Sequence, residues 1–433
     1  MSQPQAPEQS PPRSPRVHAE PVPKHRRCEE DDAEERAEVK ASGAGGCSSK
    51  EWEGEGRWLQ PRPVFDRSLI LAPMVRVSTL PMRLLSLAHG ADYVFTDEII
   101  DKKLSLCTRY WNPKTGPSGS VDYCRGGEGR ETVFRTTREE AGKCVLQVRV
   151  IRVCDVRCVT CNAQLGTADG VNALKAAEVV ARDVAGIDIN MGCPMQFSTH
   201  GGMGAQLLKR PEAAADIIAT LKRNLDKHVS CKVRAIEDPV VFSEFLRRME
   251  SAGADAVTVH CRYTDDRPVV PARWNLLSTA LDTVHVPVIL NGDVNDRATA
   301  DVAFKDWGVR GCMIARGAMA NPSCFSANPL PPWHAQQQWV AAAHYYSEPY
   351  QPLKFILMKY VMTPKTPEFL IVQESKSSLD ICRAYGLQDW AKGGQHWLQA
   401  AGAGGAAGLA APLRHASSAL RAGAVAGEKE REV

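Results

Sequence analysis

Short apolar runs alternate with amphipathic segments through the middle of the chain, a pattern typical of parallel strands joined by helical crossovers. Eight runs are predicted as strands: Leu69–Leu71, Ala91–Phe95, Cys144–Gln147, Gly186–Asn190, Val229–Val233, Ala256–His260, Pro287–Leu290 and Gly311–Ala315. Helices are predicted between most of them, over Thr79–Ala88, Asp169–Asp183, Pro211–Leu225, Pro239–Ala252 and Asn295–Trp307. Eight such units favour an α/β fold of the closed (β/α)8 TIM-barrel type over a doubly wound open sheet.

The segments that flank this pattern differ from it in composition. Residues 1–60 are rich in Pro, Ser, Gly and mixed charge, which predicts a disordered tail. The barrel is assigned to residues 65–328, and aromatic and apolar residues at helical spacing predict a small all-α domain over 331–390. Residues 391–433 form an Ala/Gly-rich segment that is also predicted to be disordered.

Composition places the chain among globular proteins. Of its 433 residues 44% are hydrophobic, enough for a sizeable core, and no run of 18 apolar residues predicts a membrane span. The 14 cysteines are scattered, so we expect reduced thiols and a cytoplasmic protein without a secretory signal. The basic pieces PPRSPR and PKHRR leave a nuclear location as an alternative. A net charge of +3 neither demands nor excludes a nucleic-acid partner.

The stretch DINMGCPMQFSTHGGMGAQLL, from Asp188 to Leu208, carries the main candidate for chemistry. A predicted strand leads into Asn190 and then into Cys193, which is followed by proline and a glycine-rich loop. A solitary cysteine is commonly a small core residue. The adjoining proline and glycines favour instead a thiol that acts on a bound ligand at a strand end.

Other polar residues recur where the predicted strands end. Lys232 and Arg234 end the fifth strand, and His260 and Arg262 the sixth. The seventh and eighth strands end in NGD and ARG, at residues 291–293 and 315–317. Each alone has a simpler interpretation as a surface charge or a core histidine. Together they match the active-site end of a barrel, where the last two loops commonly bind phosphate.

Several motifs occur in the order of one enzyme family. They are LAPMVRVSTLPMR (Leu71–Arg83), DINMGCP, GGMGAQLL, CKVR (Cys231–Arg234), VHCR (Val259–Arg262), NGD and IARGAMANP (Ile314–Pro322). From about Leu69 to Leu387 the chain therefore resembles the tRNA-dihydrouridine synthases. The details are most similar to the eukaryotic type that modifies position twenty of the D-loop.

The resemblance implies an enzyme that binds FMN, takes electrons from NADPH and reduces a flipped-out uridine of tRNA. Hydride would reach C6 from flavin N5, and Cys193 would protonate C5. It implies substrate contacts from Asn190, Arg234 and Arg262 and no metal. No membrane partner is expected, and the oligomeric state is left open with a monomer favoured. The implied FMN contacts are Ala72, Pro73, Met74, Gln164, Asn190, Lys232, His260, Asn291, Gly292, Asp293, Ala315, Arg316 and Gly317.

One segment departs from the family pattern. Residues 148–163, VRVIRVCDVRCVTCNA, separate VLQ from QLGT, so that either Gln147 or Gln164 would contact the flavin; the intact QLGT favours Gln164. Within the segment, Cys154, Cys158 and Cys161 have the spacing of radical-SAM iron–sulfur ligands. A looped-out insertion or a retained non-coding segment is the simpler interpretation. Inserted into the third strand, it would disrupt barrel closure unless it loops out.

Two other functions stay open on the sequence. One is an FMN barrel that reduces a free pyrimidine, as dihydroorotate dehydrogenases do. The other is a non-catalytic RNA-binding homologue, disabled by the insertion and by the lack of the double-stranded-RNA-binding domain that animal relatives of the position-twenty type carry where this chain has an Ala/Gly tail. The VHCR motif and the helical segment favour tRNA as the substrate.

Overall fold

The computed structural model describes residues 62–113, 115, 119–150, 167–195, 203–388 and 391. The predicted disordered tails therefore lie almost wholly outside the described residues. The same holds for Gln164 and for Cys154, Cys158 and Cys161, so the iron–sulfur interpretation is not tested.

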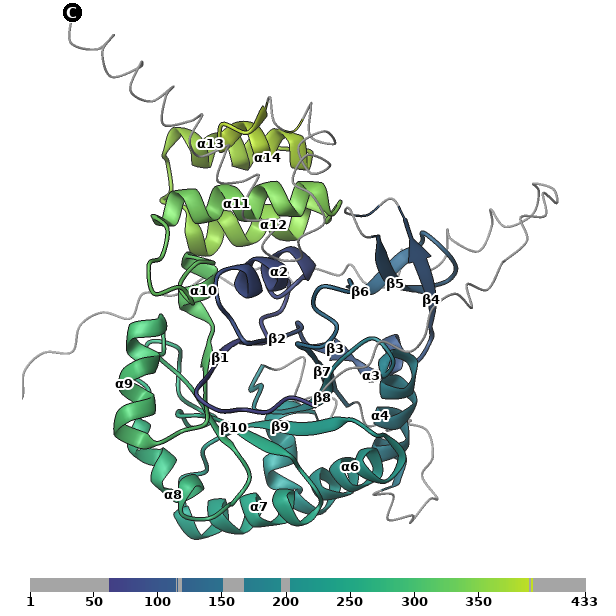
Figure 1. Cartoon of the computed structure of the whole chain (residues 1–433), viewed down its shortest axis with the longest axis vertical. Coiled ribbons are helices and arrows are strands. Elements are labelled where there is room, and N and C mark those ends of the chain that lie inside the picture. The colour runs from purple at the N-terminus through teal and green to yellow at the C-terminus, as the bar shows by residue number, and fades with distance from the viewer. Residues whose placement is uncertain are drawn as a thin grey trace, which may run out of the picture. The chain divides into compact units, whose positions relative to one another are not determined.

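Parallel strands close into a barrel in the described part of the chain (Figure 1). Its eight members are β1 (Ser68–Leu71), β2 (Tyr93–Phe95), β7 (Cys144–Arg149), β8 (Gly186–Met191), β9 (His228–Arg234), β10 (Ala256–His260), β11 (Val288–Asn291) and β12 (Gly311–Ile314). Each pairs with the next, β2 pairs with β7, and β1 pairs with β12 through Ser68 and Gly311. The predicted strands and the TIM-barrel fold are confirmed, and the ring closes although β7 leads into the 148–163 segment.

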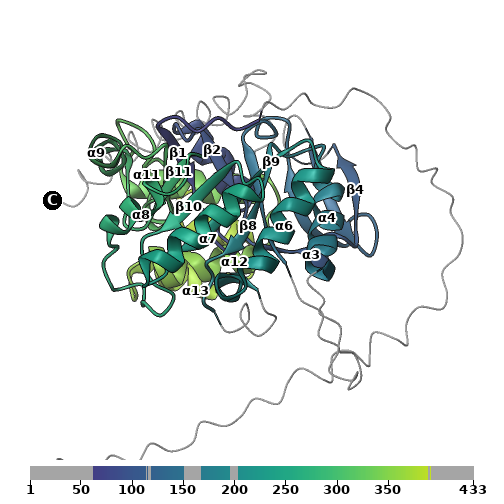
Figure 2. The same cartoon turned by 90° about the horizontal axis from the view of Figure 1, so that it is seen from below.

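Helices follow the strands around the outside of the barrel (Figure 1). The longer ones are α2 (Leu80–Ala88), α4 (Thr167–Val180), α6 (Pro211–Asn224), α7 (Pro239–Ser251) and α9 (Arg297–Trp307). The short ones are α3 (Asp101–Leu104), η1 (Gly204–Lys209), η2 (Trp274–Leu276), α8 (Leu277–Leu281) and α10 (Arg316–Ala320). Asp238 begins α7 and Asp296 begins α9, each accepting hydrogen bonds from free backbone N–H groups of the first turn. Figure 2 shows α6 and α7 from below, over the strands.

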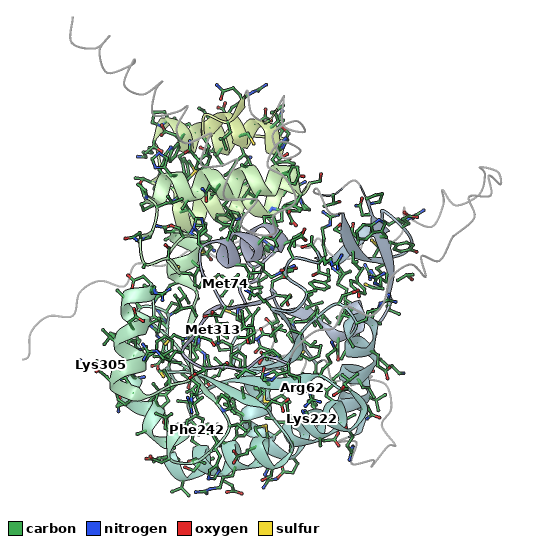
Figure 3. All side chains as sticks on the ribbon, viewed as in Figure 1. Arg62, Met74, Lys222, Phe242, Lys305 and Met313 are labelled. Carbon is green, nitrogen blue, oxygen red and sulfur yellow. The ribbon has the colours of Figure 1, made fainter. Side chains whose placement is uncertain are left out.

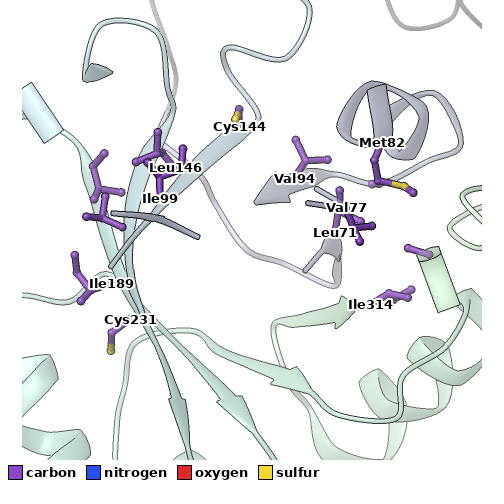
Figure 4. Packing of buried hydrophobic residues seen from close by; sticks show 14 of the residues in the cluster. Leu71, Val77, Met82, Val94, Ile99, Cys144, Leu146, Ile189, Cys231 and Ile314 are labelled. Atoms are coloured by element: carbon purple, nitrogen blue, oxygen red, sulfur yellow. The ribbon is translucent and has the colours of Figure 1, made fainter. Parts of the chain in front are cut away.

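Alternate strand positions build two apolar layers, because successive side chains of a strand point to opposite faces. Leu71 and Ile189 belong to the large cluster that packs strands against helices (Figure 4). Ile70, Val145 and Met313 belong to a second cluster that fills the barrel interior. This inner cluster is the floor on which the polar ends of the strands stand.

A small antiparallel sheet that the sequence pattern did not predict lies between β2 and β7. It consists of β4 (Cys107–Asn112), β5 (Ser120–Arg125) and β6 (Glu131–Thr136), and a short strand β3 (Ile99–Ile100) precedes it and pairs with β7. Two ion pairs fix the sheet. Arg109 binds Asp183 at the end of the barrel helix α4 at 2.6 Å, and Arg135 binds Asp122 at 2.7 Å.

A helical segment follows the barrel, as predicted. It consists of α11 (Pro332–Tyr345), α12 (Tyr350–Ile356), η3 (Leu357–Val361), α13 (Pro367–Glu374) and α14 (Ser378–Ala384). It contacts the barrel at α2, where His89 Nε2 lies 2.8 Å from Gln338 Oε1, and at β6, where Arg135 donates to the Tyr346 carbonyl at 2.6 Å. In the described ranges no helix is long and apolar enough to cross a membrane.

A buried ion pair lies where α2, the antiparallel sheet and β7 meet. Arg83 on α2 donates to both carboxylate oxygens of Glu140 at 2.8 Å, and neither side chain is more than 2% exposed. The guanidinium also donates to the carbonyls of Ser78 and Arg135. Although burial alone would lower it, the pKa of Arg83 is raised overall, because Glu140 stabilises the charge.

Candidate active site

A network of buried polar side chains crosses the barrel above its apolar floor. Gln147 Nε2 donates to Asp188 at 2.8 Å, Ser230 Oγ donates to the same carboxylate at 2.7 Å, and Asn190 Nδ2 donates to Gln147 Oε1 at 3.0 Å. Burial raises the pKa of Asp188 to about 6, and the two hydrogen bonds it accepts limit that rise. The network fixes the orientation of Asn190 at the end of β8.

Asn190 in turn shapes the turn that carries Cys193. Its Oδ1 accepts hydrogen bonds from the backbone N–H groups of Gly192 at 3.1 Å and Cys193 at 3.0 Å. Cys193 O accepts from the backbone N of Ala205, which ties the turn to η1. Of the nine cysteines in the described residues, Cys193 alone is partly exposed, and the other eight are buried. It is therefore the thiol among them that a ligand at the barrel mouth can reach.

Cations gather on the ends of β9 and β10. The strands are in register with His260 opposite Arg234, and Arg234 Nε donates to the Gly192 carbonyl beside Cys193 at 3.0 Å. Burial lowers the pKa of Lys232 to about 8, and the neighbouring positive charge of Arg234 adds to this effect. Burial and the nearby cations lower the pKa of His260 to about 2, so its ring is neutral and accepts from Arg262 Nη1 at 3.1 Å.

The ends of β11 and β12 meet around one carboxylate. Asp293 accepts from Arg262 at 2.6 Å, from the backbone N of Ala272 at 2.6 Å, and from Arg316. These contacts lower the pKa of Asp293 against the opposing effect of burial. Just before it, Asn291 Nδ2 donates to the Met313 carbonyl at 2.9 Å.

Two glycines in these loops stand where a side chain does not fit. Gly292 has φ +114°, and a Cβ there would lie 3.2 Å from the His260 ring. A Cβ on Gly317 would lie 1.7 Å from the Asn295 carbonyl oxygen, so the loop after β12 packs directly on the loop after β11. Ala315 caps α10 in front of Gly317, and the Arg316 side chain between them is 53% exposed.

The loop after β1 completes the mouth. Ala72 continues the strand by donating to the Ile314 carbonyl at 2.9 Å, and Pro73 follows it. Met74 donates from its backbone N to Ser78 Oγ at 3.1 Å and packs on both apolar clusters near the centre of the molecule (Figure 3).

The predicted site residues that the structure describes thus all lie at the carboxyl end of the barrel. Their assigned roles stay predictions. Gln147, the alternative to Gln164, lies in the polar network, and its bonds to Asp188 and Asn190 could not be predicted from the sequence. Such contacts cannot be seen in the sequence, because a single inward-pointing polar residue in an otherwise apolar strand does not reveal its partners.

A cavity that sequence reasoning missed adjoins this mouth. Its volume is about 450 Å³, and it lies between α2, β6 and the helices α11 and α12. Arg76, Arg130 and Arg135 line it together with Asp97 and Glu348. Burial raises the pKa of Asp97 to about 6 and that of Glu348 to about 7, so both carboxyls titrate near neutral pH.

The chain is similar to solved structures and to one family model. An old yellow enzyme homologue from Zymomonas mobilis matches 59% of this chain and 86% of its own at 12% identity, with a TM-score of 0.38. The family model described as dihydrouridine synthase (Dus) matches residues 156–363.

Two curated relatives carry the name tRNA-dihydrouridine(20) synthase [NAD(P)+]. The Schizosaccharomyces pombe protein is 35% identical over 268 residues, which are 60% of this chain and 52% of that protein. The Saccharomyces cerevisiae protein is 35% identical over 278 residues, 61% of this chain and 67% of that protein. The chain therefore spans about half to two thirds of the length of these relatives. With this match, and with the family's motifs gathered at one barrel mouth, the chain belongs to the dihydrouridine synthase family.

Proposed function

We propose that this chain reduces a uridine of the tRNA D-loop to 5,6-dihydrouridine, with FMN as cofactor and NADPH as reductant. The observation that carries the proposal is the half-buried Cys193 thiol, held by Asn190 at the barrel mouth within a ring of cations in a chain of this family. A cytoplasmic location and a monomeric state stay predictions from the sequence.

The residues of the mouth fit an anionic, planar cofactor. Within the described part of the chain, Lys232 makes no hydrogen bond or ion pair, although it is partly buried. An ammonium that makes no direct ion pair suits the electron-rich edge of a flavin. Arg316 can offer its exposed guanidinium to a phosphate. Ala72, Pro73 and Met74 would back the ring.

When bound, FMN would supply the hydride that adds to C6 of the uracil. The chain's own contribution is the proton at C5, for which Cys193 stands at the mouth as a general acid. Asn190 orients this thiol through its two backbone hydrogen bonds, and Arg234 closes the turn from the other side. Because a stacked base is inaccessible, the uridine must leave the tRNA fold to reach the mouth.

The RNA side of the proposal rests on charge. Arg76 and Arg130 line the cavity between the barrel and the helical segment, and their guanidinium groups can pair with phosphates of the tRNA backbone. NADPH would bind transiently at the open mouth, because no G-x-G-x-x-G fingerprint follows a strand in the sequence.

The visible spectrum of the purified full chain is the first test. Flavin bands that NADPH bleaches, followed by reduction of unmodified tRNA but not of free uracil or orotate, would support the proposal. Reduction of orotate without tRNA would favour the free-pyrimidine enzyme. A folded protein that binds tRNA but takes up no FMN would favour the disabled homologue, and a brown iron–sulfur absorption would point to Cys154, Cys158 and Cys161.

Replacing Arg316 with alanine should weaken FMN retention, because it removes a positive charge from the proposed phosphate site and leaves Asp293 with less compensation. The measurements are the flavin content per chain after gel filtration and the Kd for added FMN. Loss of one charge-assisted contact should weaken FMN binding roughly tenfold. Arg310→Ala is the matched control, since Arg310 is similarly exposed and pairs with Asp66 away from the mouth. Undiminished flavin content in Arg316→Ala would remove this residue from the phosphate site.

A further inference from the structure

The Cys193 side chain contacts a buried carboxylate. Glu98 follows β2, its side chain is 5% exposed, and it accepts a hydrogen bond from the Cys193 side chain. A carboxylate accepts this bond only while the sulfur carries its proton, so the contact selects the thiol form. Burial raises the pKa of Glu98, and the bond from Cys193 opposes that rise.

A buried guanidinium stands behind this carboxylate. Arg149 ends β7, where it is paired with Ile100 of β3, and its side chain is 9% exposed. Its Nε lies 3.6 Å from Glu98 Oε1, a distance at which the charges attract without forming a hydrogen bond. Arg149 is one of the described residues at the start of the 148–163 segment, which separates this chain from the family pattern.

Other charges face the same thiol from β9. Lys232 and Arg234 both interact electrostatically with Cys193, and Asp97 and Lys232 both act on Glu98. The cations favour a thiolate, whereas Glu98 opposes it, being in direct contact with the sulfur. The balance at Cys193 therefore depends on whether the Glu98 charge is present.

We propose that Glu98 is a positioning residue that holds Cys193 as a protonated thiol, and that Arg149 sets how strongly it does so. The proposal rests on the proposed function, in which Cys193 gives its proton to C5. After that transfer the sulfur is a thiolate and must regain a proton from water before the next turnover. The Glu98 charge makes the thiolate unfavourable, which returns the sulfur to its proton-carrying form.

The test uses FMN-loaded full-length protein and compares Glu98→Gln and Arg149→Gln with wild type. The readout is the rate of iodoacetamide alkylation of Cys193 against pH, followed by mass spectrometry of the peptide that carries it. Without the carboxylate charge the onset of alkylation should move to lower pH by about one unit or more. Without the guanidinium it should move to higher pH, because the remaining carboxylate is less compensated. Glu212→Gln is the control, since Glu212 is exposed on α6 and pairs with Arg248.

Opposite shifts in the two variants would support the proposal, because a loss of local structure would expose the thiol in both and move them alike. Unchanged alkylation profiles, or shifts of the same sign, would overturn it. The rate of dihydrouridine formation should also be measured against pH on the same proteins. Its fall at alkaline pH should begin at a lower pH in Glu98→Gln than in wild type. If the wild-type protein were inactive on tRNA but the two variants still showed opposite alkylation shifts, the proposed function would be contradicted and the role of Glu98 at Cys193 would be retained.

Discussion

Replacing Cys193 with alanine should slow dihydrouridine formation about a hundred- to ten-thousand-fold, the range that a positioned general acid contributes. FMN content should be unchanged, because the polar network that holds Asn190 is anchored by Gln147 and Asp188 and does not use the thiol. The measurement is a single-turnover assay in which flavin is first reduced by NADPH and then mixed with unmodified tRNA. Loss should appear in the oxidation of the reduced flavin by tRNA and not in its reduction by NADPH.

Cys382→Ala is the matched control, because this buried thiol lies in α14 of the helical segment and contacts neither the mouth nor Asn190. It should retain the wild-type rate once its fold is confirmed by circular dichroism. An unaffected single-turnover rate in Cys193→Ala would remove this residue from the chemistry and would leave the proton at C5 to water or to another group.

Replacing Glu140 with glutamine should lower the free energy of unfolding by about 3–5 kcal/mol, the cost of breaking a buried ion pair from one side. The Arg83 guanidinium would stay buried with two carbonyl contacts and no directly bonded counter-charge. Thr136 Oγ1, which donates to the same carboxylate at 2.9 Å, would lose a charged acceptor. The measurement is the urea midpoint of the FMN-loaded protein at constant m-value.

A control variant and a double variant test whether the loss of stability comes from the buried charge. Glu212→Gln removes an exposed carboxylate from its pair with Arg248 and should change the free energy by no more than about 0.5 kcal/mol. The double variant Arg83→Met with Glu140→Gln should be more stable than Glu140→Gln alone, because no uncompensated charge remains buried. A double variant less stable than both single variants would mean that packing, not charge, dominates at this position.

The barrel could be predicted from the sequence because each strand is a short apolar run that ends in unusual polar residues. Cys193, Lys232 and His260 were recognisable for the same reason: polar residues just after buried strands collect at one end of a parallel barrel. Nothing beyond that spacing and the family motifs was needed to bring them together.

The small antiparallel sheet escaped prediction because its strands carry charges that find their partners only in the folded chain. Arg109 is compensated by Asp183, and Arg135 by Asp122 and by a carbonyl of the helical segment. In sequence these strands look like a polar loop. The Glu98 contact escaped for a related reason, since a carboxylate after β2 and a thiol after β8 come together only when both strands pair with β7.

The bond from Arg135 to the Tyr346 carbonyl joins residues 211 positions apart. On the ribosome, the first half of the barrel therefore emerges with β1 still lacking β12 and Arg135 still lacking this acceptor. β1 cannot pair with β12, and Arg135 cannot reach its acceptor, before those later residues have been synthesised. We expect the nascent chain to stay open, with its unpaired β1 edge exposed to chaperones, until translation has passed the helical segment.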